Sequence, residues 1–258
     1  MNNNVGIILT SIERPSALKE SIQSILNNWQ DNWMLFIGDQ DTKNNYNILT
    51  EIAEQNTDKK IHIYNLGYNI GISKARNELI KKAYLENCTH ILLTADSIIF
   101  NDSMLDINFI IQQMEKQQYD MICLNLHNRI AWEANLTLIP NHSFQLDFID
   151  SNEKTMQLFV PISIGRNFWI ANTASLMNVP YDEYLVMLEH EDFFHRYKLA
   201  GYKVACTNFC SGTYKKSTNS PKYDTIRQQN FSIGKKRLLE KWNLKLWVSY
   251  VHLERIKP

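Results

Sequence analysis

The first half of the chain alternates apolar runs of strand length with segments of helical periodicity, and this alternation restricts the fold more than any other feature. The four apolar runs occupy residues 5–10, 33–38, 60–66 and 90–94. After Pro15, where a helix can begin, apolar residues recur at helical spacing. Strands joined through helices in this order form right-handed crossovers, which make neighbouring strands parallel. We therefore expect an α/β fold with a mostly parallel central sheet flanked by helices.

Beyond about Tyr119 the alternation ends, and the pattern predicts a more irregular second half. The expected elements are a strand at 120–126, short strands within 128–161, a buried strand at 167–173, a helix at 192–200, a strand at 202–207 and a last helix near 225–242. No internal repeat or low-complexity linker interrupts the chain. The simplest division is one domain over residues 1–215, with a basic helical C-terminal extension, residues 216–258, packed on it.

Length and composition set the class of protein. A chain of 258 residues with 44% apolar residues can bury a large core, which excludes a disordered protein. The apolar run at the N-terminus is too short for a signal peptide or a membrane span. Four cysteines, Cys88, Cys123, Cys206 and Cys210, match neither a zinc nor a redox motif. We expect a cytoplasmic protein with reduced thiols.

The net charge of zero hides an asymmetry between the two parts of the chain. Residues 195–258 contain 14 Lys or Arg and three acids, a net charge of +11, so residues 1–194 carry −11. A cationic C-terminal quarter indicates an anionic ligand, an anionic polymer or a membrane surface nearby. A solvated basic helix explains the charge equally well.

Polar clusters follow the apolar runs at the points where the strands end. They lie at residues 10–14, 39–41, 69–77 and 96–97. In an open α/β sheet, ligands bind beyond the carboxyl ends of the strands, so these clusters are expected to meet at one edge. Their convergence predicts a site for a ligand the size of a nucleotide.

The segment "NIGISKARN" is the most informative of these clusters. Gly67 and Gly71 allow close approach of the backbone to a ligand, and the start of the following helix favours an anion. Arg76 and Lys74 add positive charge. A helix start with an unrelated arginine is an equally good interpretation from these residues alone.

This segment resembles the "N-x-G-x-(S/G)-x-A-R-N" element of inverting GT-A glycosyltransferases, which helps to bind the nucleotide-sugar donor. The matching residues are Asn69, Gly71, Ser73, Ala75, Arg76 and Asn77. The resemblance implies a GT-A, Rossmann-like fold and a nucleotide sugar, usually a UDP-sugar. It also implies that Thr10, Arg14 and Asp39 surround the base. A loop residue capping the next helix is the alternative for Thr10, and a turn aspartate for Asp39.

The segment "LEHEDFFHRYKLAGYKV" contains two adjacent acids, Glu191 and Asp192, at the start of a predicted helix. The helix dipole alone accounts for acids in a first turn. The family resemblance extends to this E-D pair, and it implies that Asp192 is the general base and that Glu191 contacts the acceptor or the sugar. We therefore expect Asp192 to face a crevice formed by the segments around residues 10, 39, 76 and 96.

Together with "NFWIANT", this stretch is most similar to the β-1,4-galactosyl- and N-acetylgalactosaminyltransferase branch. That likeness implies that Asn167, Trp169 and Asn172 lie near the donor sugar or the acceptor, although Trp169 is as easily a core residue. It also implies that Trp242 lies in a helix closing over the donor. An apolar helix face is more often part of the core, and docking of this helix on a membrane surface is another alternative.

The segment "LLTADSIIF" departs from the family. Relatives hold Mn²⁺ or Mg²⁺ on the diphosphate with Asp-x-Asp, whereas this degenerate DxD site has Ala95, Asp96 and Ser97. One carboxylate is a poor ligand set for a hard cation. Our hypothesis is that no metal is required and that Lys215 or Lys216 stabilises the leaving diphosphate.

In that hypothesis Arg76, and Lys235 or Lys236, contribute further positive charge, while Asp96 and Ser97 contact the donor, with Asp96 bonded to a ribose hydroxyl. The alternative is that Mn²⁺ or Mg²⁺ still binds through Asp96 and water.

The sequence thus predicts an inverting glycosyltransferase that moves a hexose or N-acetylhexosamine from a UDP-sugar to a hydroxyl acceptor. A bacterial or phage glycan intermediate is the favoured acceptor, and an anionic one suits the charge of the C-terminal segment. One alternative is a catalytically inactive GT-A binding module. Another is a polyanionic acceptor such as hydroxymethylated DNA, which the absence of a nucleic-acid motif disfavours.

Overall fold

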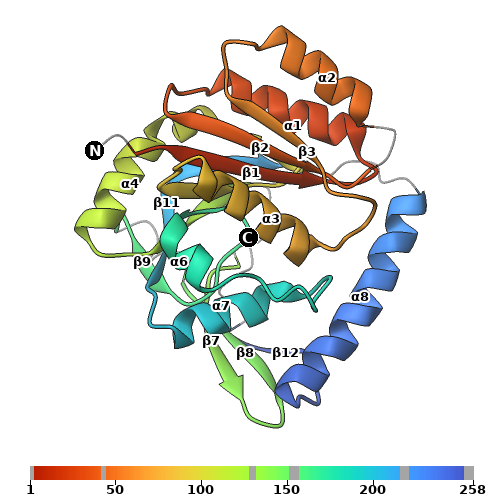
Figure 1. The fold of residues 1–258 in the computed structure, drawn as a ribbon. Helices are drawn as coiled ribbons and strands as arrows, with labels where there is room; N and C mark the ends of the chain where they lie inside the picture. The colour runs from red at the N-terminus through yellow and green to blue at the C-terminus, as the bar shows by residue number, and fades with distance from the viewer. Residues whose placement is uncertain (1–2, 42–44, 128–131, 151–156, 216–220, 253–258) are drawn as a thin grey trace.

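The computed structural model describes residues 3–41, 45–127, 132–150, 157–215 and 221–252. Within these residues a nine-stranded sheet forms the centre of the molecule (Figure 1). Its strands in spatial order are β3 (Ile61–Asn65), β2 (Trp33–Asp39), β1 (Val5–Ser11), β4 (His90–Leu93), β10 (Trp169–Asn172), β6 (Met121–His127), β11 (Val204–Tyr214) and β5 (Ile98–Phe100), with β9 (Val160–Ile162) paired to β11.

Most neighbouring strands of this sheet run parallel. β1 pairs in parallel with β2 and β4, β2 with β3, and β6 with β11, whereas β10, β5 and β9 are antiparallel to their partners. The prediction of a mostly parallel α/β sheet is confirmed. The carboxyl ends of β1, β2 and β4 consequently lie at one edge of the sheet.

Helices cover both faces of the sheet. One face carries α1 (Pro15–Asn27), α2 (Tyr46–Gln55), α4 (Ile107–Lys116) and the short 3-10 helix Asp102–Asp106, and the other carries α3 (Ile72–Leu85), α6 (Thr173–Asn178) and α7 (Glu189–Leu199) (Figure 1). Alternate residues of β1 enter the two cores: Ile7 and Leu9 pack beneath α1, and Ile8 packs beneath α3. Burial on both faces explains why this strand is a continuous apolar run.

A second, three-stranded sheet was not predicted in this form. β7 (Ala134–Ile139) and β8 (Ser143–Phe148) form an antiparallel hairpin, and β12 (Val248–Val251) adds to β8 in parallel. The long helix α8 (Pro221–Trp242) precedes β12 and runs along the side of the molecule (Figure 1). The division of the chain at residue 215 stays a prediction.

Two boundaries differ from those expected, and one of them matters for the site. α7 begins at Glu189, three residues before the predicted start, and β11 continues to Tyr214. The earlier start places Glu189, Glu191 and Asp192 together in the first turn of α7. Among the described helices, none has the length and apolar character needed to cross a bilayer.

Candidate functional site

A crevice lies at the carboxyl ends of β1, β2 and β4, where the sequence predicted a ligand site. It has two adjoining compartments. The first, of about 260 Å³, is lined by Thr10, Ser11, Ile12, Arg14, Gln40, Ile72, Arg76, Thr94, Ala95, Asp96, Ser97, Tyr214, Tyr223 and Arg227. The second, of about 220 Å³, is lined by Ile12, Gln40, Asn69, Gly71, Ile72, Val186, Met187, Glu189, Tyr223, Ile226, Arg227 and Asn230.

Several predicted donor-binding residues therefore meet here. Thr10, Arg14, Arg76, Asp96 and Ser97 line the first compartment, and Asn69 and Gly71 line the second. Gly71 has a φ of 92°, a conformation that favours glycine, and it is the N-cap of α3 at the second compartment. The backbone of the 69–71 turn thereby forms part of the crevice wall.

Asp96 is neutralised from within the protein. Its Oδ1 accepts a hydrogen bond from Arg14 Nη1 at 2.5 Å, and its Oδ2 accepts one from Ser11 Oγ at 2.8 Å. Burial raises the pKa of Asp96, and the Arg14 charge and the Ser11 hydroxyl offset part of that effect. Both carboxylate oxygens are thus already engaged, by the last side chain of β1 and by Arg14 just beyond it.

A second buried arginine–carboxylate pair joins α3 to α7. Arg76 Nη1 donates to Glu189 Oε1 at 2.5 Å, and Asn167 Nδ2 donates to the same oxygen at 3.3 Å. Burial lowers the pKa of Arg76, but Tyr181 and Glu189 outweigh that effect and raise it overall. Because Glu189 lines the second compartment, this pair places a carboxylate at the crevice.

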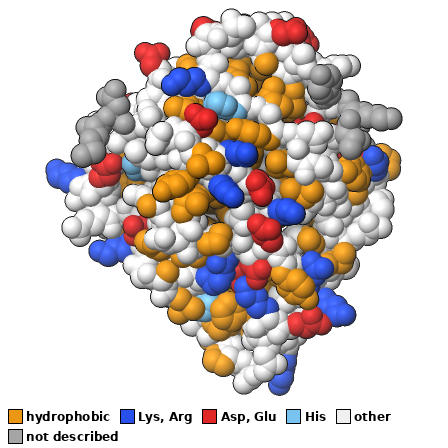
Figure 2. All heavy atoms as spheres, viewed as in Figure 1, with side chains coloured by type: hydrophobic (Ala, Val, Ile, Leu, Met, Phe, Trp, Pro, Cys, Tyr) orange, Lys and Arg blue, Asp and Glu red, His pale blue; other side chains and the backbone are white. Residues whose placement is uncertain are grey.

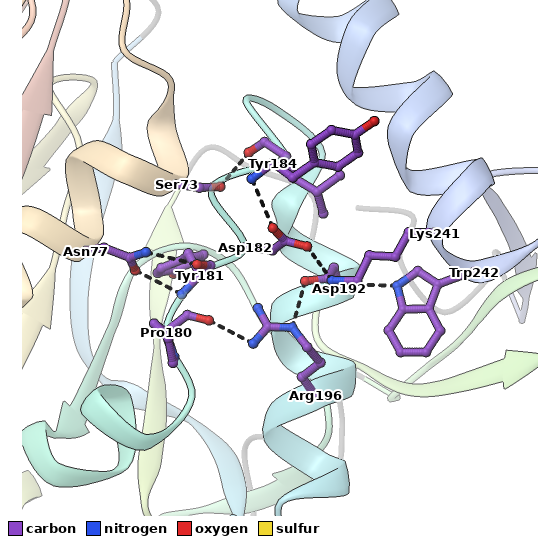
Figure 3. Close-up of polar contacts among 11 residues, drawn as sticks. Ser73, Asn77, Pro180, Tyr181, Asp182, Tyr184, Asp192, Arg196, Lys241 and Trp242 are labelled. Carbon is purple, nitrogen blue, oxygen red and sulfur yellow. Dashed lines mark hydrogen bonds and ion pairs between the residues drawn. The ribbon is translucent and has the colours of Figure 1, made fainter.

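Ser73 and Asn77 of the "NIGISKARN" segment bind protein rather than open space, whereas Lys74 is exposed. Ser73 Oγ donates to the carbonyl of Leu185 at 2.5 Å, and Asn77 makes reciprocal hydrogen bonds with the backbone of Tyr181 at 2.9 Å (Figure 3). These contacts dock α3 on the segment that leads into α7. They position Arg76 and Glu189 against each other.

Asp192 does not face the crevice. Its side chain has no exposed surface, and it accepts from Arg196 Nε at 2.8 Å, from Trp242 Nε1 at 2.9 Å and from Lys241 Nζ at 2.6 Å (Figure 3). The expectation that this carboxylate faces the crevice is therefore wrong for this structure, and its role as general base stays a prediction. Asp192 instead joins α7 to the end of α8.

Glu191 is also turned away from the crevice. The residue is only 2% exposed and lines neither compartment. Burial raises its pKa to about 7. The structure therefore does not bring Glu191 to the crevice, and its predicted contact with the acceptor or the sugar stays a prediction.

Other predicted sugar or acceptor residues lie elsewhere. Trp169 is fully buried and stacks on Phe193, so the alternative of a core residue is correct. Asn172 accepts from the amide of Ala174 at the start of α6, at the opposite end of the sheet. Trp242 is held by Asp192, and Asn167 reaches the crevice only through Glu189.

Two predicted donor-binding groups are engaged outside the crevice. Asp39 accepts from the amide of Asp41 and from Asn45 Nδ2, which is the turn aspartate given as its alternative. Lys215 pairs with Glu20 at 2.6 Å in a neighbouring hollow, so the structure does not bring it to the crevice. Lys216 lies outside the described residues.

The described residues do not fit a divalent metal ion at Asp96. A hard cation needs several oxygen ligands, yet both oxygens of Asp96 are engaged by Arg14 and Ser11. No three His, Cys, Asp or Glu side chains in the described parts of the chain come together as a metal site. Arg14 occupies the place beside Asp96 where a cation would bind.

Glu189 and the face of α8 that lines the crevice were not predicted from the sequence. That face consists of Tyr223, Ile226, Arg227 and Asn230. Their spacing of three, four and seven residues is that of one side of a helix, so this signal was present in the sequence. Glu189 was missed because α7 was predicted to begin three residues later.

Comparisons with known proteins agree with this architecture. A family model described as glycosyl transferase family 2 matches residues 7–174. A search of curated proteins found no significant match. Among solved structures, S. aureus TarS has a TM-score of 0.58 at 13% identity, covering 94% of this chain and 40% of that chain.

Two structures with bound donors are similar to the same extent. TarS 1–349 in complex with UDP-GlcNAc has a TM-score of 0.58 at 14% identity, covering 94% of this chain and 67% of that one. The mannosyltransferase PcManGT from Pyrobaculum calidifontis, in complex with GDP-Man and Mn²⁺, has a TM-score of 0.61 at 9% identity, covering 92% and 64%. The chain spans about 40% to two thirds of the length of these proteins, and such identities show the fold alone.

Proposed function

The chain belongs to glycosyltransferase family 2, and on that premise we propose that it transfers a hexose or N-acetylhexosamine from a UDP-sugar to a hydroxyl acceptor with inversion. The observation that carries the proposal is the crevice at the carboxyl ends of the parallel strands. Arg14, Arg76 and Arg227 line it, against the two carboxylates of Asp96 and Glu189. This excess of positive charge suits a nucleoside diphosphate.

The structural neighbours support a nucleotide-sugar donor. TarS 1–349 is described in complex with UDP and with UDP-GlcNAc, and PcManGT in complex with GDP-Man. We favour the UDP-sugar because it is the donor implied by the "NIGISKARN" segment. A glycan intermediate as acceptor and a cytoplasmic location are part of the same proposal.

Inversion requires one displacement at the anomeric carbon. The acceptor oxygen attacks from the side opposite the diphosphate while its proton passes to a base, and the bond from the anomeric carbon to the diphosphate oxygen breaks. The base must lie within hydrogen-bond reach of the acceptor hydroxyl. The diphosphate leaves with the bonding electrons, so positive charge must be ready to receive it.

We assign the base to Glu189 in place of Asp192. Of the two carboxylates that line the crevice, Asp96 has both oxygens engaged, whereas Glu189 uses Oε1 for Arg76 and Asn167. No hydrogen bond joins Glu189 Oε2 to the described part of the chain. That oxygen is therefore the carboxylate atom available to an acceptor hydroxyl.

Replacement of Glu189 by Gln tests this assignment. The rate at which the sugar is transferred from a UDP-sugar to water or to an added acceptor, measured as UDP released, is expected to fall by about 10²–10⁴. The reason is that the general base is lost. Binding of UDP should stay within a few-fold of the wild-type value. Both quantities can be measured on the purified protein, by a coupled UDP assay and by calorimetry.

Two further variants control this experiment. Glu189→Gln leaves Arg76 buried without its counter-ion, which can destabilise the protein. Glu189→Asp keeps the charge and therefore serves as the control for a loss of activity that is only structural. Glu54→Gln, at an exposed position of α2, should behave as wild type. Near-normal turnover by folded Glu189→Gln would remove Glu189 from the role of base.

One observation favours a second candidate function, a nucleotide-sugar-binding module without transfer. Both crevice carboxylates are ion-paired with arginine, which competes with an acceptor hydroxyl for their oxygens. This candidate predicts UDP-sugar binding with no turnover for any acceptor. The alternative to a glycan acceptor is a polyanionic acceptor, whose binding would weaken in high salt.

A further inference from the structure

The helix α8 contributes one wall of the crevice. Tyr223, Ile226, Arg227 and Asn230 form its inward face, and Asn230 Nδ2 donates to Asn69 Oδ1 at 2.9 Å. Tyr223 lies against the guanidinium of Arg14, at 5.2 Å from the ring centre. The wall is therefore joined to the loops that follow β1 and β3.

Arg227 differs from the other two arginines of the crevice. Arg14 and Arg76 are each paired with a buried carboxylate. Arg227 is exposed and lines both compartments, yet no ion pair or hydrogen bond joins it to another part of the chain that the structure describes. Its charge is thus available to a ligand.

The position of Arg227 matters because Asp96 does not fit a metal ion. The Arg14 guanidinium takes the place of a cation at Asp96, but that charge is balanced by the carboxylate itself. A leaving diphosphate needs further positive charge, and Lys215 lies outside the crevice with Glu20. Arg227 is the crevice cation that no described acid balances.

We propose that Arg227 binds the diphosphate of the donor and receives its growing negative charge, so that donor binding needs no divalent cation. This inference rests on the proposed function. The guanidinium presents parallel N–H groups that match two phosphate oxygens at once. As the bond between the anomeric carbon and the diphosphate oxygen breaks, these N–H groups keep their hydrogen bonds to oxygens that now carry more charge.

The test compares UDP with uridine as ligands in buffer containing EDTA. Arg227→Ala is expected to weaken UDP binding by about 10- to 100-fold, as for the loss of charge-assisted hydrogen bonds, and to leave uridine binding unchanged. Arg227→Lys should recover part of the loss, because it keeps the charge without the paired N–H groups. Lys245→Ala, an exposed cation beyond the end of α8, should bind UDP as wild type does.

The outcomes separate this inference from the proposed function. Equal UDP affinity of Arg227→Ala and wild type, or a wild-type affinity that rises tenfold or more with Mn²⁺, would overturn the inference and leave the glycosyltransferase proposal standing. Failure of the folded wild-type protein to bind UDP would overturn the proposed function itself. Unchanged uridine binding by Arg227→Ala shows that the variant is folded.

Discussion

Glu191 has the most unusual environment among the acids of α7. It lies beside Asp192 in the first turn of the helix, yet its side chain enters the core, where Oε2 has no hydrogen-bond partner. Burial raises its pKa to about 7, compared with an ordinary value of 4.5. The folded protein therefore favours the neutral, protonated form of this group.

This shift predicts a pH dependence of stability. Because the folded state binds the proton more tightly, the free energy of unfolding falls as the pH rises from about 4.5 to above 7, by up to about 3 kcal/mol from Glu191. Glu191→Gln, which is neutral at every pH, should equal wild type near pH 4.5 and be more stable at pH 8. Urea unfolding at both pH values measures the free energy of unfolding of the two proteins. An equal difference between them at both pH values would contradict the prediction.

Residue contacts also explain why the chemistry was harder to predict than the fold. The buried strands of the first half could be predicted from the sequence as apolar runs, because both of their faces are covered. Asp192 and Glu189 are three residues apart in one helical turn, and the sequence does not say which of them faces the crevice. The start of α7 decides it, and helix starts are less clearly encoded than helix periodicity.

At the scale of elements, α8 lies on the body with few of its residues buried. Only Gly234 and Leu238 are buried among its residues. A side chain at position 234 would place its Cβ 2.2 Å from the carbonyl oxygen of Met187, so the helix can approach this loop only through glycine. The same loop carries Val186 and Met187 into the second compartment.

Gly234→Ala should therefore destabilise the docked helix, although alanine raises helix propensity by about 1 kcal/mol. The backbone clash is expected to cost about 1–3 kcal/mol and to increase hydrogen exchange over residues 221–242. Affinity for UDP should fall as Tyr223 and Arg227 move. Ser232→Ala, exposed on the same helix, serves as the control, and a stabilised Gly234→Ala would refute the close contact.

The hairpin of β7 and β8 lies within 128–161, where short strands were predicted, but the sheet that it forms was not. Each strand has only six residues, and the structure places the two strands in a small sheet that is distinct from the main one. Completion of that sheet by β12, from the far end of the chain, depends on tertiary contacts. Local periodicity contains no information about such a pairing.

At the scale of the whole molecule, the opposite charges of the two parts of the chain meet in ion pairs. Lys215 pairs with Glu20, Lys222 with Glu13, and Lys241 with Asp182 and Asp192. Figure 2 shows acidic and basic side chains interspersed over the viewed face rather than segregated. Part of the positive charge that predicted an anionic partner is therefore balanced by acids within the protein.

These pairs predict a selective effect of salt. Raising the ionic strength from about 0.1 M to about 1 M shortens the Debye length from about 10 Å to about 3 Å and weakens exposed pairs most. Lys222 is 60% exposed, so its contact with Glu13 should loosen. Hydrogen exchange at residues 221–230 is expected to accelerate while the amides of β1 do not change. Equal acceleration in both would contradict the prediction.

The wall formed by Tyr223 and Arg227 comes from the last quarter of the chain, whereas the strand ends it faces come from the first half. During synthesis, the sheet edge with Thr10 and Asp96 emerges from the ribosome well before α8. A nascent chain therefore exposes the ends of β1 and β4 before Tyr223 and Arg227 are present to line the crevice. Arg227 can take part in ligand binding only after β11, the last strand of the central sheet along the chain, has been made.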